Sequence, residues 1–164
     1  MRKRGSKRCG IAAALSLSAL LVAGAGGAQA AEEGEALFNQ HCAVCHQPGG
    51  VGAPGLAPAL ASLLGKRVSA PGGREYLPRV LLGGLSGAIV AGGEKFNGMM
   101  LPFPQLHDEQ LAALSHYLLG TLNKDTLAAD FAPLTAADFA AWRGKPASSA
   151  ENRKLRTQLD AAGQ

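Results

Sequence analysis

The sequence predicts an all-α fold of four or five short helices, followed by a C-terminal helical extension. Most segments with a regular apolar pattern have the helical period and carry acidic first turns or glycines at their ends. The one strand-like pair, on either side of Gly92-Gly93, is too short to define a sheet. A chain of 164 residues that begins with a leader has the length of one domain.

The first thirty residues have the pattern of a secretory signal peptide. A basic segment, Arg2–Arg8, precedes an apolar run, Ile11–Ala25, and Ala28-Gln29-Ala30 is a small-x-small cleavage site. An uncleaved membrane anchor is the alternative, but the run contains serine and glycine and is shorter than the roughly 20 clean apolar residues of a span. We therefore expect cleavage after Ala30 and export to a bacterial-type periplasm.

Loss of this segment changes the charge of the protein. The whole chain has 16 Lys and Arg against 12 Asp and Glu, but five of the basic residues lie in the leader. The mature chain is then nearly neutral, with 11 basic against 12 acidic residues, and it has no basic patch for nucleic acid. Cys9 also leaves, so Cys42 and Cys45 remain and no structural disulfide is expected.

The first half of the mature chain predicts three helices. Glu32–Cys45 begins with three glutamates, which favour a helix N-terminus, and is followed by a Gly- and Pro-rich loop over Gln47–Leu56. A short helix is expected over Ala59–Leu64. Another is expected over Arg74–Leu82, ended by Gly83-Gly84.

The second half predicts a hairpin and three more helical stretches. Residues 89–91 and 94–96 flank the possible two-residue turn, and His107–Leu119 is the clearest helix, with an apolar stripe typical of core. Leu134–Arg143 and Glu151–Leu159 predict helices in the extension over residues 123–164. Either the extension packs on the domain surface, which the apolar positions favour, or it docks a larger partner.

The pentapeptide Cys42-Ala43-Val44-Cys45-His46 has the C-x-x-C-H pattern by which c-type haem is attached. The two thiols can add to the two vinyl groups of one porphyrin, and the following histidine is placed to ligate the iron. A thioredoxin-like pair would need a strand and a βαβ pattern around it, and a zinc site would need a second ligand pair nearby. Neither context is present, so the motif predicts one covalent haem c.

The second axial ligand decides between an electron carrier and a haem that binds or transforms ligands. Phe96-Asn97-Gly98-Met99-Met100-Leu101-Pro102-Phe103 contains two thioether sulfurs. Here the sequence resembles class I c-type cytochromes, whose segment before the last helix has the form G-x-M-P-x-F or N-G-x-M-P-P-F. The resemblance implies Met100 as the ligand. Leu101 stands where that family has proline, and Met99, His107 and His116 remain as alternatives.

The resemblance covers residues 32–122 and implies a haem domain over residues 31–122. Gly34 and Phe38 match the positions at which that family's first helix crosses its last, and Tyr117 matches the aromatic partner. Pro58, 12 residues after His46, matches the proline whose carbonyl accepts a hydrogen bond from the proximal imidazole.

The resemblance implies a monohaem electron carrier, not an enzyme, which passes single electrons between larger redox proteins. Weak transient docking suits that task, because turnover requires release. One alternative is a dedicated cytochrome subunit of a periplasmic dehydrogenase or reductase complex, tethered by residues 123–164. The other is a haem enzyme or sensor with an open sixth position, for which no distal acid–base pair is evident.

Overall fold

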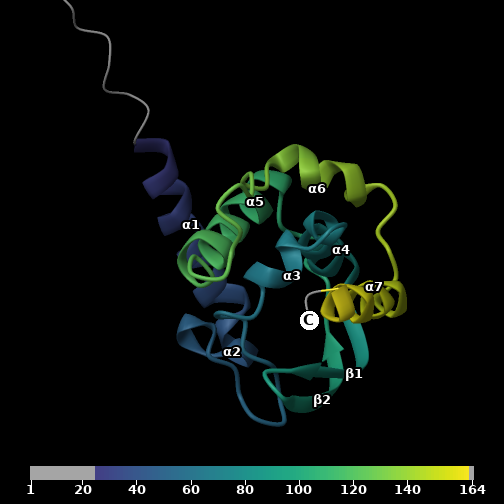
Figure 1. Ribbon diagram of the computed structural model, residues 1–164. Coiled ribbons are helices and arrows are strands. Elements are labelled where there is room, and N and C mark those ends of the chain that lie inside the picture. The colour runs from purple at the N-terminus through teal and green to yellow at the C-terminus, as the bar shows by residue number, and fades with distance from the viewer. Residues whose placement is uncertain (1–24, 163–164) are drawn as a thin grey trace, which may run out of the picture.

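The computed structural model describes residues 25–162, which form mainly short helices and one small antiparallel sheet at an edge of the molecule (Figure 1). The helices are α1 (Ala25–His41), α2 (Ala43–His46), α3 (Gly65–Ser69), α4 (Tyr76–Gly83), α5 (Asp108–His116), α6 (Ala136–Arg143) and α7 (Ser149–Ala162), and the strands are β1 (Leu85–Ala91) and β2 (Glu94–Met100). Single 3₁₀ turns at Pro48–Gly50 and Gly73–Glu75 and a π-helical turn at Tyr117–Thr121 complete the elements. The predicted helical architecture is confirmed.

Most of the predicted signal peptide, residues 1–24, lies outside the described residues. Helix α1 begins at Ala25, so the predicted cleavage site after Ala30 falls within a helix. The single helix predicted over Glu32–Cys45 is in fact two, because Cys42 departs from helical geometry with φ −113°. This break ends α1 at His41 and starts α2 at Ala43.

The crossing of α1 and α5 holds the two ends of the predicted haem domain together. A Cβ atom on Gly34 would overlap the carbonyl group of Ala113, so only glycine permits this backbone approach. The ring of fully buried Phe38 lies 5.5 Å from that of Tyr117. The crossing inferred from Gly34, Phe38 and Tyr117 is therefore present.

The strand pair at Gly92-Gly93 is longer than expected. The seven residues of β1 pair with the seven of β2 in antiparallel register from Leu85–Met100 to Ala91–Glu94. Both turn glycines have positive φ, +58° and +84°, as a two-residue hairpin turn requires. The predicted turn is confirmed, but the expectation that the segments are too short for a sheet is wrong.

Residues 59–64 do not form the expected helix. The backbone N–H groups of Leu60 and Ala61 donate to the carbonyl of Gly50, and that of Ser62 donates to Leu122. Ser62 also has φ +60°, which no right-handed helix accommodates. The segment is a loop whose hydrogen bonds are made to distant backbone, and the helix begins only at Gly65.

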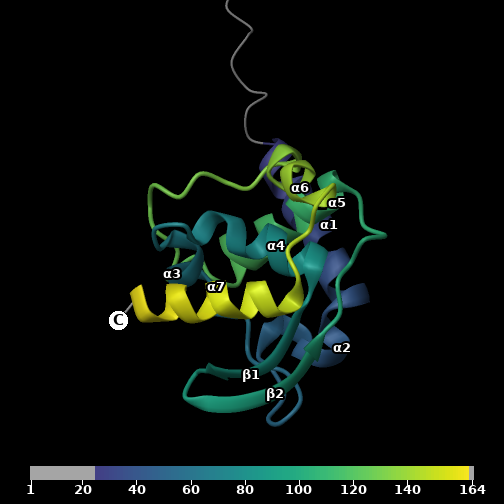
Figure 2. The same ribbon diagram turned by 90° about the vertical axis from the view of Figure 1, so that its right-hand side faces the viewer.

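Helices α6 and α7 of the extension form as predicted and pack against the rest of the molecule. Thr135 is the N-cap of α6, and its N–H donates to the Asp138 carboxylate. Helix α7 lies along the hairpin and beneath α4 (Figure 2). Phe139 of α6 is fully buried, and Leu155 and Leu159 of α7 belong to the same core cluster. The packed extension favoured by the sequence is the arrangement observed.

Within residues 25–162, no helix has both the length and the apolar character needed to cross a membrane.

Candidate haem site

The C-x-x-C-H segment lies where α1 gives way to α2. The N–H of His46 donates to the carbonyl of Cys42 at 2.9 Å, which closes one helical turn across the motif. Cys42 and His46 are buried, Cys45 is exposed, and all three line one cavity. The local helix therefore turns both thiols and the imidazole toward a common space.

The imidazole of His46 is fixed by the carbonyl of Pro58, 2.8 Å from its Nδ1. This is the contact that the resemblance to class I c-type cytochromes implies for Pro58. A carbonyl oxygen only accepts, so Nδ1 carries the proton and donates it. In a neutral ring, Nε2 is then left with the lone pair that binds a metal.

Burial controls the ionisation of these groups. It lowers the pKa of His46, and the hydrogen bond to Pro58 acts in the opposite direction to a smaller extent. At neutral pH the ring is therefore neutral. Burial, together with the nearby Cys45, raises the pKa of the Cys42 thiol to about 11, so this group stays protonated and uncharged.

The cavity has a volume of about 360 Å³ and a mainly apolar wall. Its lining comes mainly from the loop after α2, from α3 and α4, and from the hairpin, with further residues from the π-helical turn and α7. The apolar side chains include Leu60, Leu63, Leu64, Leu77, Val80, Leu81, Leu85, Ile89, Phe96, Phe103 and Leu118.

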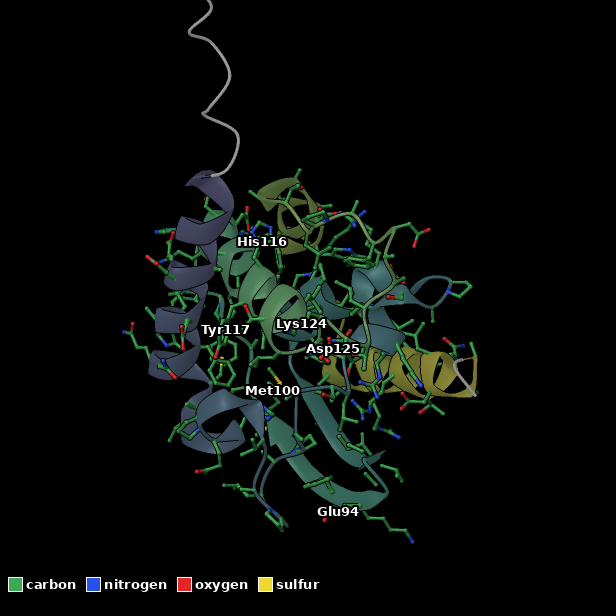
Figure 3. All side chains as sticks on the ribbon, turned by 60° about the vertical axis from the view of Figure 1, so that its left-hand side comes forward. Glu94, Met100, His116, Tyr117, Lys124 and Asp125 are labelled. Atoms are coloured by element: carbon green, nitrogen blue, oxygen red, sulfur yellow. The ribbon has the colours of Figure 1, made fainter. Side chains whose placement is uncertain are left out.

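Met100 and Met99 both line this cavity from the end of β2. Consecutive strand residues point to opposite faces, so the two thioethers do not have the same surroundings. Met100 is partly buried and packs against the core cluster, whereas 72% of Met99 is exposed. Figure 3 shows Met100 in the middle of the molecule, near one end of the hairpin.

The other two candidate ligands lie elsewhere. His107 is the exposed N-cap of α5, and its backbone N–H donates to the Gln110 side chain. The Nε2 atom of His116 lies 2.9 Å from the carbonyl of Leu134, and Figure 3 shows this residue well away from Met100. Neither histidine is among the residues that line the cavity.

Two arginines lie in the cavity wall, and no sequence motif marks either of them as a site residue. Arg67 of α3 and Arg156 of α7 are the only Lys, Arg, Asp or Glu residues among the described lining. One signal was available: Asn152 and Arg156 are four residues apart, as are Leu155 and Leu159, so all four share one face of α7. All four are buried.

Comparison with known proteins agrees with this geometry. Residues 31–121 match the family described as Cytochrome c. The chain is 39% identical over 144 residues to a protein named Cytochrome c-552 from Thermus thermophilus, an alignment that covers 85% of this chain and 96% of that protein. A second Cytochrome c-552 of Thermus thermophilus is 39% identical over 127 residues, covering 75% and 96%.

The chain belongs to the cytochrome c family, and it is a monohaem c-type cytochrome. Membership implies a covalently attached haem c and an electron-transfer function with redox partners. The residues present fit that group: an apolar cavity with two thiols, a neutral imidazole with a free Nε2 and a thioether matches a flat apolar macrocycle with a central iron.

Proposed function

We propose that this protein is a periplasmic carrier of single electrons whose haem is held by Cys42 and Cys45 and ligated by His46 and Met100. The Pro58 carbonyl completes the site by holding the imidazole. One observation carries the proposal. A single apolar cavity brings both thiols, the His46 ring and the Met100 side chain together from segments 54 residues apart, while His107 and His116 lie outside it.

The chain's own residues explain how such a carrier works. The haem, when bound, supplies an iron that alternates between two oxidation states. The Nδ1–H bond to Pro58 fixes the ring orientation and makes Nε2 a better donor. Met100 would supply a thioether to the iron, and such a ligand favours the reduced state. With His46 and Met100 both holding the iron, electron transfer would need little rearrangement of the protein.

Exposed apolar side chains at the cavity suit a transient redox partner. Val44, Leu56, Met99 and Leu101 line the cavity and are also exposed on the surface. A small apolar patch of this kind supports short-lived docking, because weak encounters use small interfaces. Export through the predicted signal peptide would place the protein where haem c carriers meet such partners.

The apolar faces of the C-terminal extension are already covered by the rest of the chain. Phe139, Leu155 and Leu159 are buried against the same chain, so these apolar faces of α6 and α7 are already covered. This favours an independent carrier over a cytochrome subunit held by residues 123–164.

The optical spectrum of the oxidised protein tests the ligation. A weak sulfur-to-iron charge-transfer band in the near-red is expected in the parent protein. Replacing Met100 with alanine should abolish it, because the iron then loses its sulfur ligand, and Met99→Ala is the matched control that should retain it.

Each result has a distinct meaning. If the band is lost only in Met99→Ala, Met99 and not Met100 is the sulfur ligand. A parent protein without the band would have an open or nitrogen-ligated sixth position, and the haem enzyme or sensor would replace the carrier as the proposed function.

A further inference from the structure

The C-terminal helix places a buried arginine in the cavity wall. The side chain of Arg156 is 6% exposed. Its Nη1 donates to the Tyr76 hydroxyl at 3.1 Å and its Nη2 donates to the Val90 carbonyl at 2.9 Å. Its Nε has no hydrogen-bond partner in the described structure, although the Asp160 carboxylate lies within ion-pair range at 3.5 Å. A buried N–H of a charged group thus remains unsatisfied at the cavity.

Arg67 belongs to the same cluster. Its side chain is 9% exposed, its Nε donates to Asp160 Oδ1 at 2.8 Å, and its Nη2 lies 2.7 Å from the same oxygen in an ion pair. Its guanidinium also lies 5.4 Å from the centre of the Tyr76 ring, whose hydroxyl accepts from Arg156. The two arginines therefore share one carboxylate and one tyrosine.

The cluster carries an unbalanced positive charge. Arginine stays protonated in proteins, so Arg67 and Arg156 contribute two charges and Asp160 removes one. An isolated charge away from water is costly unless it is paired. The described lining contains no Asp or Glu, so the balancing carboxylate must come from what the cavity binds.

We propose that Arg156, with Arg67, binds a propionate of the haem, which makes the C-terminal extension part of the haem site. A haem is apolar except for its two carboxylates, and these arginines are the only permanent cations in the described wall, which is otherwise mainly apolar. One propionate brings the cluster to zero net charge and supplies an acceptor for the Arg156 Nε. The inference rests on the haem placement proposed above.

The competing explanation is purely structural. Arg156 joins α7 to the Val90 backbone of β1 and to Tyr76 at the start of α4, so it could serve only to hold these elements together. A measurement of stability would not separate the two roles. The propionate pKa separates them, because a neighbouring cation stabilises the ionised carboxylate and lowers its pKa.

The elements packed around Arg156 present the following titratable or charged groups to it. Helix α3 presents Arg67, α4 presents Tyr76, and α7 itself presents Asp160. Strand β1 contains no titratable side chain. A shift of the propionate pKa in a variant of one of these residues can therefore be assigned to the cluster.

The experiment uses the holoprotein with ¹³C-labelled haem carboxyl groups and follows each propionate by NMR as pH varies. In the parent protein, one propionate should titrate well below the other. Arg156→Gln should raise that pKa, because one cation is lost, and Arg156→Lys should restore most of the shift. Asp160→Asn should lower it further, because a competing anion is lost.

Lys154→Gln is the matched control: it removes the same charge from an exposed position of the same helix and should leave both propionates unchanged. Equal propionate titrations in Arg156→Gln and Lys154→Gln would overturn the proposal, as would an Asp160→Asn shift in the same direction as that of Arg156→Gln. An intact near-red band in each variant verifies the fold. If the parent protein lacks the near-red band but its propionates titrate as described, the proposed Met100 ligation is wrong and this inference stands.

Discussion

Asn123 shows how one buried polar side chain shapes the cavity wall. Its Oδ1 accepts from the N–H groups of Leu64 and Gly65, and its Nδ2 donates to the carbonyls of Leu60 and Leu118. All four bonds are made to backbone, and the three to Leu60, Leu64 and Gly65 satisfy groups that a helix over residues 59–64 would otherwise have paired. Because Leu60 and Leu64 line the cavity, Asn123 also positions part of the cavity wall.

At the residue scale, sequence alone predicts a common orientation of side chains where the residues are neighbours in the chain. Cys42, Cys45 and His46 are adjacent in the chain, so their common orientation follows from one helical turn. Several partners of Arg156 and Asn123 are 58 to 80 residues away in the chain, and no motif around either residue predicts those partners. Such polar contacts become visible only when the fold is known.

The ionised side chain of Asp138 is expected to stabilise the protein. Partial burial acts to raise its pKa, but hydrogen bonds from Arg74 and Thr135 outweigh burial and hold the pKa below its usual 3.8. The folded pKa is thus below the unfolded one, so this contribution is complete above pH 3.8 and is lost as pH falls through the folded pKa. Asp138→Asn should lower the free energy of unfolding by about 1 kcal/mol at neutral pH.

The measurement is denaturant unfolding of Asp138→Asn and the parent across the acid range. The difference between them should shrink as pH falls below 3.8. Asp130→Asn, which alters an exposed carboxylate nearby, should differ little from the parent at any pH. A deficit in Asp138→Asn that does not vary with pH would show that the carboxylate charge is irrelevant to α6.

At the scale of elements, the contact of α1 with α5 depends on glycine. In Gly34→Ala the new methyl group would meet the backbone of Ala113, which cannot rotate away as a side chain can. Alanine favours a helix over glycine by about 1 kcal/mol, but overpacking at a rigid contact typically costs about 1–3 kcal/mol or more. We expect a net loss of about 2 kcal/mol in unfolding free energy, measured by circular dichroism in denaturant.

Gly120→Ala is the control for this contact. Gly120 lies in the π-helical turn after α5, is exposed, and has no atom within 4 Å of the position of a new Cβ. That variant should be as stable as the parent or slightly more so. If both substitutions have the same effect, helix propensity and not the close approach governs stability at Gly34.

Elements were predictable where local signals and tertiary contacts agree. Helices α4 to α7 have caps and apolar faces that match their packing, so their positions followed from the sequence. The loop over residues 59–64 has a helix-compatible composition, but its backbone bonds to Gly50 and Leu122 instead. The hairpin strands are longer than predicted. Helix α7 packs on β1, and the sequence of residues 85–100 alone does not predict this contact.

At the scale of the whole molecule, the extension and the haem domain share one hydrophobic core. Leu134, Phe139, Leu155 and Leu159 belong to the same cluster as Phe38 of α1 and the residues of α5. Sequence patterns suggested a boundary at residue 122, because the haem-domain signals stop there. The packing instead predicts that both parts unfold together.

The single tryptophan makes this prediction testable, because Trp142 lies in α6 and reports on the extension, while haem absorbance reports on the proposed haem site. We expect both signals to change at one denaturant concentration, since independent loss of α6 would expose the buried Phe139 and the core beneath it. Phe139→Ala should shift both transitions equally, by about 3–5 kcal/mol in unfolding free energy. Fluorescence that changes at lower denaturant than haem absorbance would show that the extension detaches first, and the haem domain would then be stable without it.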